Sequence, residues 1–190
     1  MSRSSTILSI VLFAAVGSCV YIAALTGNPA QADDADDTQM RAVIGGLIIE
    51  PETEMPVVLL MDEAKTRYMP IFIGENEAQA IFRYHHKMWA PRPLTHDLIV
   101  SMVETLGAKI TRVTVTKLEA GTYFAEIEIT RNGEVMKVDA RPSDSMAIAL
   151  KTGVPVYVAQ QVFDEASRPV DEGLEIPHPP ERAPLPEDAI

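Results

Sequence analysis

The sequence has one cysteine, Cys19, among 190 residues, and it lies in an apolar stretch near the N-terminus. A chain cleaved after that stretch has no disulfide framework, no cysteine nucleophile and no thiolate metal site. Basic residues are also few, because 16 Lys and Arg stand against 27 Asp and Glu. Bulk electrostatic binding of nucleic acid normally needs a basic face, so nucleic-acid activity here requires a local basic patch or bound cations. A phosphate-binding glycine loop, a nucleophile elbow and a zinc motif are absent too.

The first 32 residues have the pattern of an export signal. Arg3 precedes an apolar stretch over residues 7–25, and a small-x-small site over residues 30–32 comes directly before an acidic run. This predicts cleavage after Ala32 and an exported protein, periplasmic or secreted. Because about nineteen apolar residues approach the minimum for spanning a bilayer, the alternative is a retained inner-membrane anchor. A lipoprotein signal at Cys19 fits less well, since the apolar run continues past it.

Composition divides the chain into four parts. Residues 1–32 are the signal peptide or membrane anchor, 33–40 an acidic linker, 41–165 a single domain and 166–190 an acidic, proline-rich tail. The length that remains after cleavage suffices for one domain with a hydrophobic core. The tail lacks the apolar content to pack, so we expect it to be disordered.

Strand and helix patterns alternate inside the domain. The strands are expected at residues 43–49, 57–61, 68–73, 110–118, 122–131, 134–140 and 155–159. Three helices are expected, from Glu75 to about Met88, from Thr95 towards Gly107 and from Pro142 towards Gly153. In the first, Ala78, Ile81 and Phe82 form the predicted core face, with Tyr84 or His85 as a further candidate. The fold class is therefore α+β, a compact single domain with a mixed sheet and about three helices.

Two of these helices begin with similar sequence motifs, at residues 92–97 and 141–145. Each motif places Arg-Pro at the helix start, where the N–H that proline lacks would have no partner in the helix. We expect Thr95, Ser143 or Asp144 to cap the remaining N–H donors. A helix start with an arginine beside it favours an anion. Two such starts in one small domain suggest phosphate, bound by Arg92, Arg141 and Ser143.

The Asn132-Gly133 pair predicts a tight hairpin with a defined register. A two-residue turn places Glu126 opposite Asp139 and Phe124 opposite Arg141. Two carboxylates about 5 Å apart can share a divalent cation, Mg²⁺ or Mn²⁺, and Asp144 would complete the set. The alternative is that Arg141 or solvent neutralises the pair without a metal.

Proton transfer and nucleic-acid contact have candidates elsewhere in the domain. His96, Asp97 and Glu77 are the candidate catalytic residues, although the helix dipole alone explains an acid such as Asp97 in a first turn. The only basic and aromatic cluster spans residues 83–92 and has the composition to track a nucleic-acid backbone and stack a base. The alternative, which we favour, is a solvated helix end.

The segments 70–78, 92–97, 106–108, 121–125 and 138–145 together resemble the bifunctional nuclease family of bacteria and plants in residues, order and spacing. The resemblance extends over roughly residues 41–165 and excludes the leader and tail. It implies a compact α+β domain, a homodimer, and nuclease activity on DNA and RNA. It supplies no agreed catalytic set, so the site residues are inferred from their chemistry alone.

Two functions follow as expectations. The first is an exported or membrane-tethered phosphodiesterase-type nuclease that acts on DNA, RNA or both with Mg²⁺ or Mn²⁺. If the leader is kept, residues 7–25 form the membrane tether. The second is a non-catalytic anion- or protein-binding module with the same fold. The predicted roles are catalytic for His96, Asp97 and Glu77, substrate-binding for Arg92, Arg141 and Ser143, and metal-binding for Glu126, Asp139 and Asp144.

Overall fold

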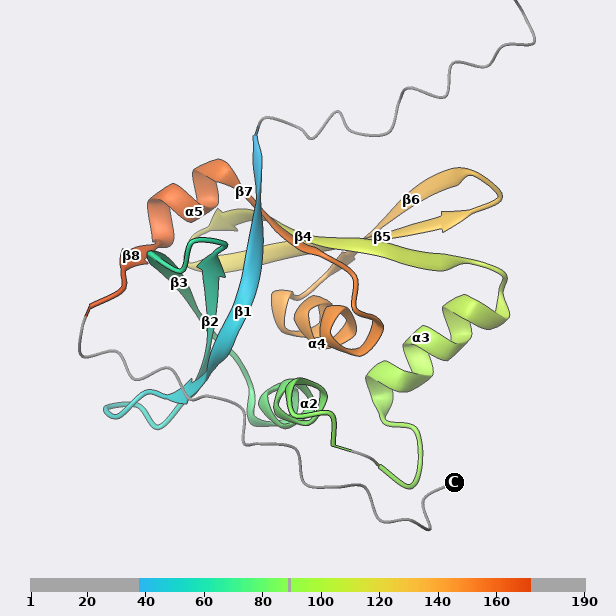
Figure 1. Cartoon of the computed structure of the whole chain (residues 1–190), viewed down its shortest axis with the longest axis horizontal. Coiled ribbons are helices and arrows are strands. Elements are labelled where there is room, and N and C mark those ends of the chain that lie inside the picture. The colour runs from blue at the N-terminus through green and yellow to red at the C-terminus, as the bar shows by residue number, and fades with distance from the viewer. Residues whose placement is uncertain (1–37, 89, 172–190) are drawn as a thin grey trace, which may run out of the picture. The chain divides into compact units, whose positions relative to one another are not determined.

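The computed structural model describes residues 38–88 and 90–171. The predicted leader and residues 172–190 of the predicted tail lie outside the described residues. The described part contains eight strands in one sheet and four helices (Figure 1). The strands are β1 (Gln39–Ile49), β2 (Pro56–Asp62), β3 (Arg67–Phe72), β4 (Lys109–Glu119), β5 (Thr122–Arg131), β6 (Glu134–Ala140), β7 (Val156–Ala159) and β8 (Arg168–Pro169). The helices are α2 (Glu75–His85), α3 (Thr95–Thr105), α4 (Pro142–Thr152) and α5 (Gln160–Ala166).

The strand order is β6-β5-β4-β7-β1-β2-β3-β8. All neighbours are antiparallel except β4 and β7, which are parallel. The sheet is thus mixed, as predicted. The parallel step arises because α4 connects β6 to β7 and returns the chain to the middle of the sheet.

One helix and one strand were not predicted. The prediction of about three helices is wrong by one, because α5 follows β7 directly and has only seven residues. Two helical turns are too short for a periodic pattern to stand out. Strand β8 then pairs with the start of β3. The packed domain therefore continues past the predicted boundary at residue 165.

The β5–β6 hairpin has the predicted register. Glu126 lies opposite Asp139, and the turn residues Asn132 and Gly133 have φ of 52° and 83°, as a type I′ turn requires. The predicted pairing of Phe124 with Arg141 is wrong, because the ladder ends one pair earlier. Helix α4 begins there, since Pro142 occupies its first turn.

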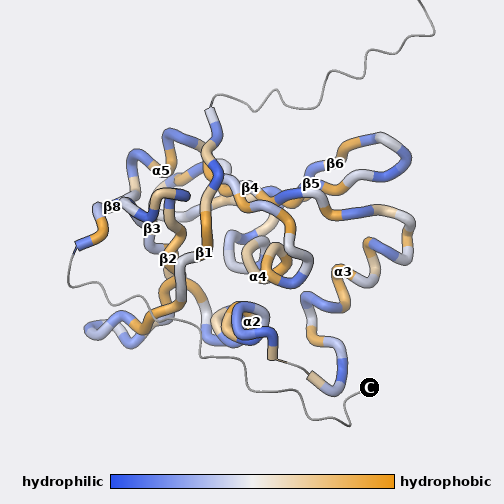
Figure 2. The backbone as a smooth tube through the Cα atoms, viewed as in Figure 1, coloured by the Kyte–Doolittle hydropathy of each residue, from blue (hydrophilic) through white to orange (hydrophobic). Residues whose placement is uncertain are grey.

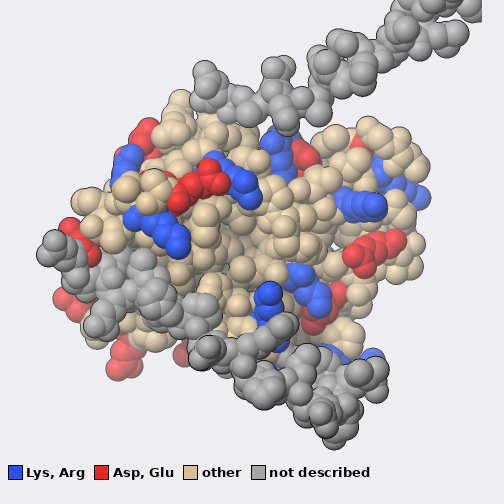
Figure 3. All heavy atoms as spheres, in the orientation of Figure 1, with Lys and Arg blue, Asp and Glu red and all other residues tan. Residues whose placement is uncertain are grey.

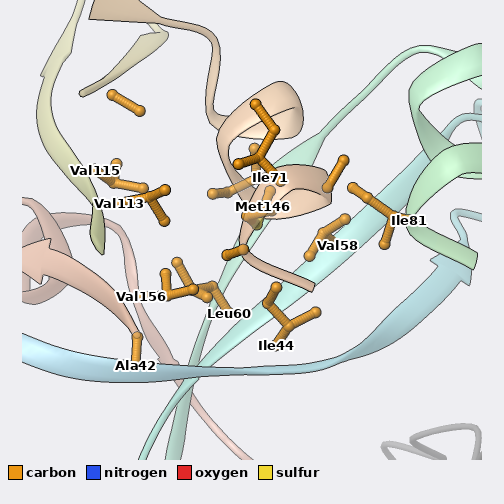
Figure 4. Close-up of a cluster of buried hydrophobic side chains, with 14 of the residues drawn as sticks. Ala42, Ile44, Val58, Leu60, Ile71, Ile81, Val113, Val115, Met146 and Val156 are labelled. Atoms are coloured by element: carbon orange, nitrogen blue, oxygen red, sulfur yellow. The ribbon is translucent and has the colours of Figure 1, made fainter. Parts of the chain in front are cut away.

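Helix α4 is the most deeply buried helix and lies at the centre of the hydrophobic core. Met146 and Ile148 are at most 1% exposed, and Met146 points among strand residues such as Val58 and Ile71 (Figure 4). Figure 2 shows α4 as a largely apolar helix, whereas α2 and α3 alternate between polar and apolar residues. Both of those helices pack against α4. This arrangement brings the polar first turns of three helices together.

The predicted core face of α2 needs one correction. Ala78 and Ile81 are buried as expected, but Phe82 is 44% exposed and Ala80 is buried instead. Phe82 instead lines an open pocket with Leu47 and Ile49 of β1, and its ring centroid lies 4.2 Å from that of His86. No described helix has the length and apolar content needed to span a membrane.

Candidate active site

The first turns of α2, α3 and α4 each carry a carboxylate at the third helical position: Glu77, Asp97 and Asp144. Acids are favoured there because the helix N-terminus has a partial positive charge. The predicted side-chain caps from Thr95, Ser143 and Asp144 are wrong, because these residues lie inside the helices, and the N-cap residues Leu94 and Arg141 make no side-chain cap hydrogen bond. In α3 the Asp97 carboxylate instead accepts a 2.8 Å bond from the Leu94 amide.

Arg141 joins two of these carboxylates. It is the N-cap residue of α4, and its Nε and Nη2 donate to Asp144 at 2.7 and 3.0 Å. Its Nη2 also donates to Glu77 of α2 at 2.6 Å. The two N–H groups on Nη1 make no hydrogen bond within the described part of the chain. Because the Arg141 side chain is 64% exposed, these donors are accessible from solvent.

His96 completes this network from α3. Its Nε2 lies 3.1 Å from Oδ1 of Asp144, and its side chain is only 8% exposed. The ring of Tyr84 packs edge-on against it with centroids 6.3 Å apart. We call Glu77, His96, Arg141 and Asp144 the first polar layer.

A second polar layer consists of Tyr84, Asp97 and Lys151. The Lys151 ammonium lies 2.7 Å from Oδ1 of Asp97 and 5.9 Å from the centre of the Tyr84 ring. Tyr84 follows Glu77 by seven residues on α2, and Lys151 follows Asp144 by seven on α4. Seven residues are two helical turns, so along α2 and α4 the backbone positions of the two layers lie about 10.5 Å apart. His96 and Asp97, adjacent in α3, contribute to different layers.

The layers favour charged carboxylates. Burial raises the pKa of Asp144, but hydrogen bonds from Arg141 and His96 outweigh it and leave that pKa below its usual value. The pKa of Glu77 is also lowered, by its own backbone amide and by Arg141. In the second layer, burial and the charge of Asp97 raise the pKa of Tyr84 to about 12. At neutral pH both acids of the first layer are thus ionised.

Arg92 lies outside both layers. It is exposed and lines a groove of about 940 Å³ beside the second layer. The groove is bounded by the C-terminal end of α2, the loop after it, one face of α3 from Asp97 to Glu104 and the last turn of α4. Figure 3 shows basic side chains over the area where these three helices approach one another.

The three predicted metal ligands do not come together. Glu126 lies opposite Asp139 as predicted, but Lys137 approaches Glu126 to 3.3 Å, so lysine provides the compensating charge we had assigned to Arg141 or solvent. Asp139 is exposed, and Asp144 is bonded to Arg141 and His96. Among residues 38–88 and 90–171, no three His, Cys, Asp or Glu side chains are grouped so as to hold a metal ion.

Four of the nine predicted site residues therefore meet in the first layer, and Asp97 lies in the second. Ser143 is buried at 7% exposure beside Arg141. Sequence reasoning missed Tyr84 and Lys151 as site residues. Their seven-residue distance from Glu77 and Asp144 was the available signal, because that spacing returns to the same face of a helix. Gly74 carries a signal too, since a Cβ there would collide with the Glu77 carboxylate.

Comparison with known proteins gives consistent similarities. A family model described as bifunctional nuclease domain matches residues 58–171. An uncharacterised protein of Mycobacterium tuberculosis is 44% identical over 121 residues, which cover 64% of this chain and 72% of that protein. Bifunctional nuclease 1 of Arabidopsis thaliana is 26% identical over 146 residues, or 73% of this chain and 45% of the relative. Bifunctional nuclease 1 of Oryza sativa subsp. japonica is 24% identical over 109 residues, 56% of this chain and 33% of the relative.

Proposed function

Because the chain belongs to the bifunctional nuclease domain family, we propose that it is a phosphodiesterase-type nuclease that cleaves DNA, RNA or both. The plant relatives named as bifunctional nucleases support this, although the chain spans less than half of their length. One observation carries the proposal. Glu77, His96 and the Arg141–Asp144 pair come from three separate segments and converge in one network with a solvent-accessible guanidinium.

In this proposal Arg141 binds the scissile phosphate. Its Nη1 donors are accessible, and the two carboxylates hold the guanidinium in one orientation before substrate arrives. A fixed guanidinium matches phosphate geometry and stabilises the charge that develops during phosphodiester cleavage. Ser143, at the second position of α4, lies beside it, and the free N–H groups of the helix start add to the positive potential.

Proton transfer is assigned to His96, with Glu77 as the second candidate. Asp144 lies within hydrogen-bond distance of His96 Nε2, so it positions the imidazole and fixes its tautomer, as carboxylates do for catalytic histidines. The lowered pKa of Glu77 makes it a weaker base than an unpaired carboxylate. Asp97 takes a supporting role, because it holds Leu94 and Lys151.

A divalent cation, Mg²⁺ or Mn²⁺, is a separate part of the proposal; its support is the pairing of Glu126 with Asp139, in which Lys137 also approaches Glu126. The predicted set of three carboxylates is not assembled among the described residues. Cleavage assayed with and without chelator tests the need for a cation.

Export is the proposed location, with cleavage after Ala32 and inner-membrane anchoring as the alternative. Mass spectrometry of the protein recovered from its own cells tests this. An N-terminus at Asp33 supports cleavage, whereas a product that retains residues 7–25 supports the anchor. A homodimer is also proposed, and the exposed apolar face of α3 is its candidate interface.

The nuclease proposal is tested by cleavage of labelled single-stranded DNA and RNA with Mg²⁺, with Mn²⁺ and with chelator. The variant is Arg141→Gln, and the control is Arg131→Gln, which removes an exposed arginine from the β5–β6 turn. We expect Arg141→Gln to lower the cleavage rate about a hundred-fold or more and Arg131→Gln to leave the cleavage rate unchanged.

Each result has a distinct meaning. Cleavage that chelator abolishes supports the cation, and cleavage that chelator leaves intact removes it. Equal cleavage by Arg141→Gln and the unmodified protein contradicts the assigned site and points to a contaminant. No cleavage by any folded sample favours the non-catalytic binding module.

A further inference from the structure

We propose that the groove beside the second polar layer binds the backbone of a single-stranded nucleic acid and guides it to Arg141, an inference that rests on the proposed nuclease function. The groove has a volume of about 940 Å³. Its walls come from α2, α3 and α4, which also carry the two polar layers. Tyr84 lines the groove and its ring packs against His96 with centroids 6.3 Å apart, so one wall of the groove contacts the first polar layer.

Charge is the first reason for this assignment. The groove is lined by the basic residues Arg83, Lys87, Arg92 and Lys151, against the acidic residues Asp97 and Glu104. Asp97 and Lys151 are paired with each other, and Asp97 also accepts from the Leu94 amide, so the excess positive charge comes from Arg83, Lys87 and Arg92 against Glu104. The groove is therefore a cationic strip on a chain whose net charge is −11.

The helix dipole does not explain all of these cations. Arg83 and Lys151 lie in the last turns of α2 and α4, where basic residues offset the negative end of the dipole. Lys87 and Arg92 lie in the loop beyond α2, and both are exposed. This loop turns back along the groove, so its cations face the same space as Lys151. Our preferred interpretation of residues 83–92 as a solvated helix end therefore accounts for only part of the cluster.

The other lining residues favour a single strand over a duplex. Proline and apolar side chains lie between the cations: Met88, Pro91, Pro93 and Leu94, with the Tyr84 ring. Proteins that bind single strands without sequence preference combine a basic groove with aromatic side chains on which bases stack, and Tyr84 supplies such a ring here. A duplex keeps its bases stacked inside and needs a broad basic face, which a chain with excess acidic residues does not provide.

The test is fluorescence anisotropy of the full chain with a labelled 12-nucleotide poly(dT) or poly(U) probe, measured in chelator at several salt concentrations. The variants are Lys87→Gln, Arg92→Gln and the double variant. Lys87 has a φ of 52°, and glutamine, which is also unbranched at Cβ, has the same steric cost at that backbone conformation. The control is Lys65→Gln, an exposed lysine in the β2–β3 turn that also lies at positive φ and changes the net charge equally.

We expect the slope of log K against log salt to fall by about 0.7 for each phosphate contact removed, hence by about 1.4 for the double variant, while Lys65→Gln keeps the slope of the unmodified protein. Gel analysis verifies that the probe stays intact, and circular dichroism verifies the fold. Unchanged binding by the folded double variant overturns the groove, and equally tight binding of a 12-base-pair duplex overturns the preference for single strands.

The failures of the two proposals are distinguishable. Binding that depends on Lys87 and Arg92 without any cleavage leaves the groove standing and removes the nuclease. Cleavage that depends on Arg141 but is indifferent to Lys87 and Arg92 leaves the nuclease standing and removes the groove.

Discussion

Three of the five N–H groups of Arg141 donate to the carboxylates of Glu77 and Asp144, yet the Arg141 side chain is 64% exposed. An exposed arginine normally samples many rotamers, and each ion pair at a surface contributes little stability. Two carboxylates from different helices remove that freedom. The entropy of orienting the guanidinium is thus lost during folding and not when phosphate binds, which is the advantage of a preorganised site.

Asp144 belongs to the candidate active site and also contributes to the stability of the fold. We expect Asp144→Asn to lower the free energy of unfolding at pH 7 by about 1–3 kcal/mol, because charge-assisted hydrogen bonds to Arg141 and His96 are lost. The folded-state pKa of Asp144 lies below its ordinary value of 3.8, so its charged form contributes stability above that pH. The contribution disappears as the pH falls through the folded-state pKa.

Urea unfolding between pH 7 and pH 3 measures this effect. The difference between the unmodified protein and Asp144→Asn should narrow at the acid end. Glu134→Gln, an exposed acid at the start of β6, serves as the control and should differ little at any pH. A difference for Asp144→Asn that stays constant across the range contradicts the ionic origin of the stabilisation.

Residue identity predicted the first polar layer better than the second. Arg141, His96 and Asp144 belong to two short motifs whose residue types indicate phosphate binding. The motifs lie close together because each begins a helix, and the two helices pack against each other. Tyr84 and Lys151 stand near the ends of their helices, in positions that core packing and the helix dipole already explain. Their seven-residue spacing from Glu77 and Asp144 places them on the same helix faces, but only the packing of α2 and α3 against α4 shows that these faces meet.

At the scale of elements, local rules predicted most of the fold. The register of β5 and β6 followed from two turn residues, because a two-residue turn fixes every pair of the ladder. Helix α3 shows where such rules end. Its apolar residues have helical spacing, but Leu98, Met102 and Leu106 are 55%, 57% and 62% exposed. Periodicity detects a helix with apolar residues on two sides, and it does not tell which side faces the core.

The exposed face of α3 has a consequence for assembly at the scale of the whole molecule. Leu98, Met102 and Leu106 are four residues apart, so they form one stripe along the helix. The side of α3 that lines the groove carries Asp97 and Ser101 instead. Met136 and Val138 are also exposed, at 38% and 45%, and the β5–β6 hairpin that carries β6 lies on the same side of the molecule as α3 in Figure 1. An exposed apolar stripe such as that on α3 is typical of an interaction site.

A second copy of the chain suits this stripe because the stripe is symmetric about its centre. In an antiparallel crossing at Met102, Leu98 of one protomer meets Leu106 of the other, and the same contact recurs across the twofold axis. We therefore expect light scattering after size exclusion to give twice the mass of one chain, and Met102→Glu to give a single-chain mass, because two carboxylates would face each other in an apolar contact.

Met55→Glu, at an exposed methionine before β2, controls for the added charge and should leave the dimer intact. A dimer that survives Met102→Glu moves the interface away from α3, and a single-chain mass for the unmodified protein at every concentration removes the homodimer. Because the groove lies on the other side of α3, dissociation should leave oligonucleotide binding unchanged, which separates assembly from the proposed track of the substrate.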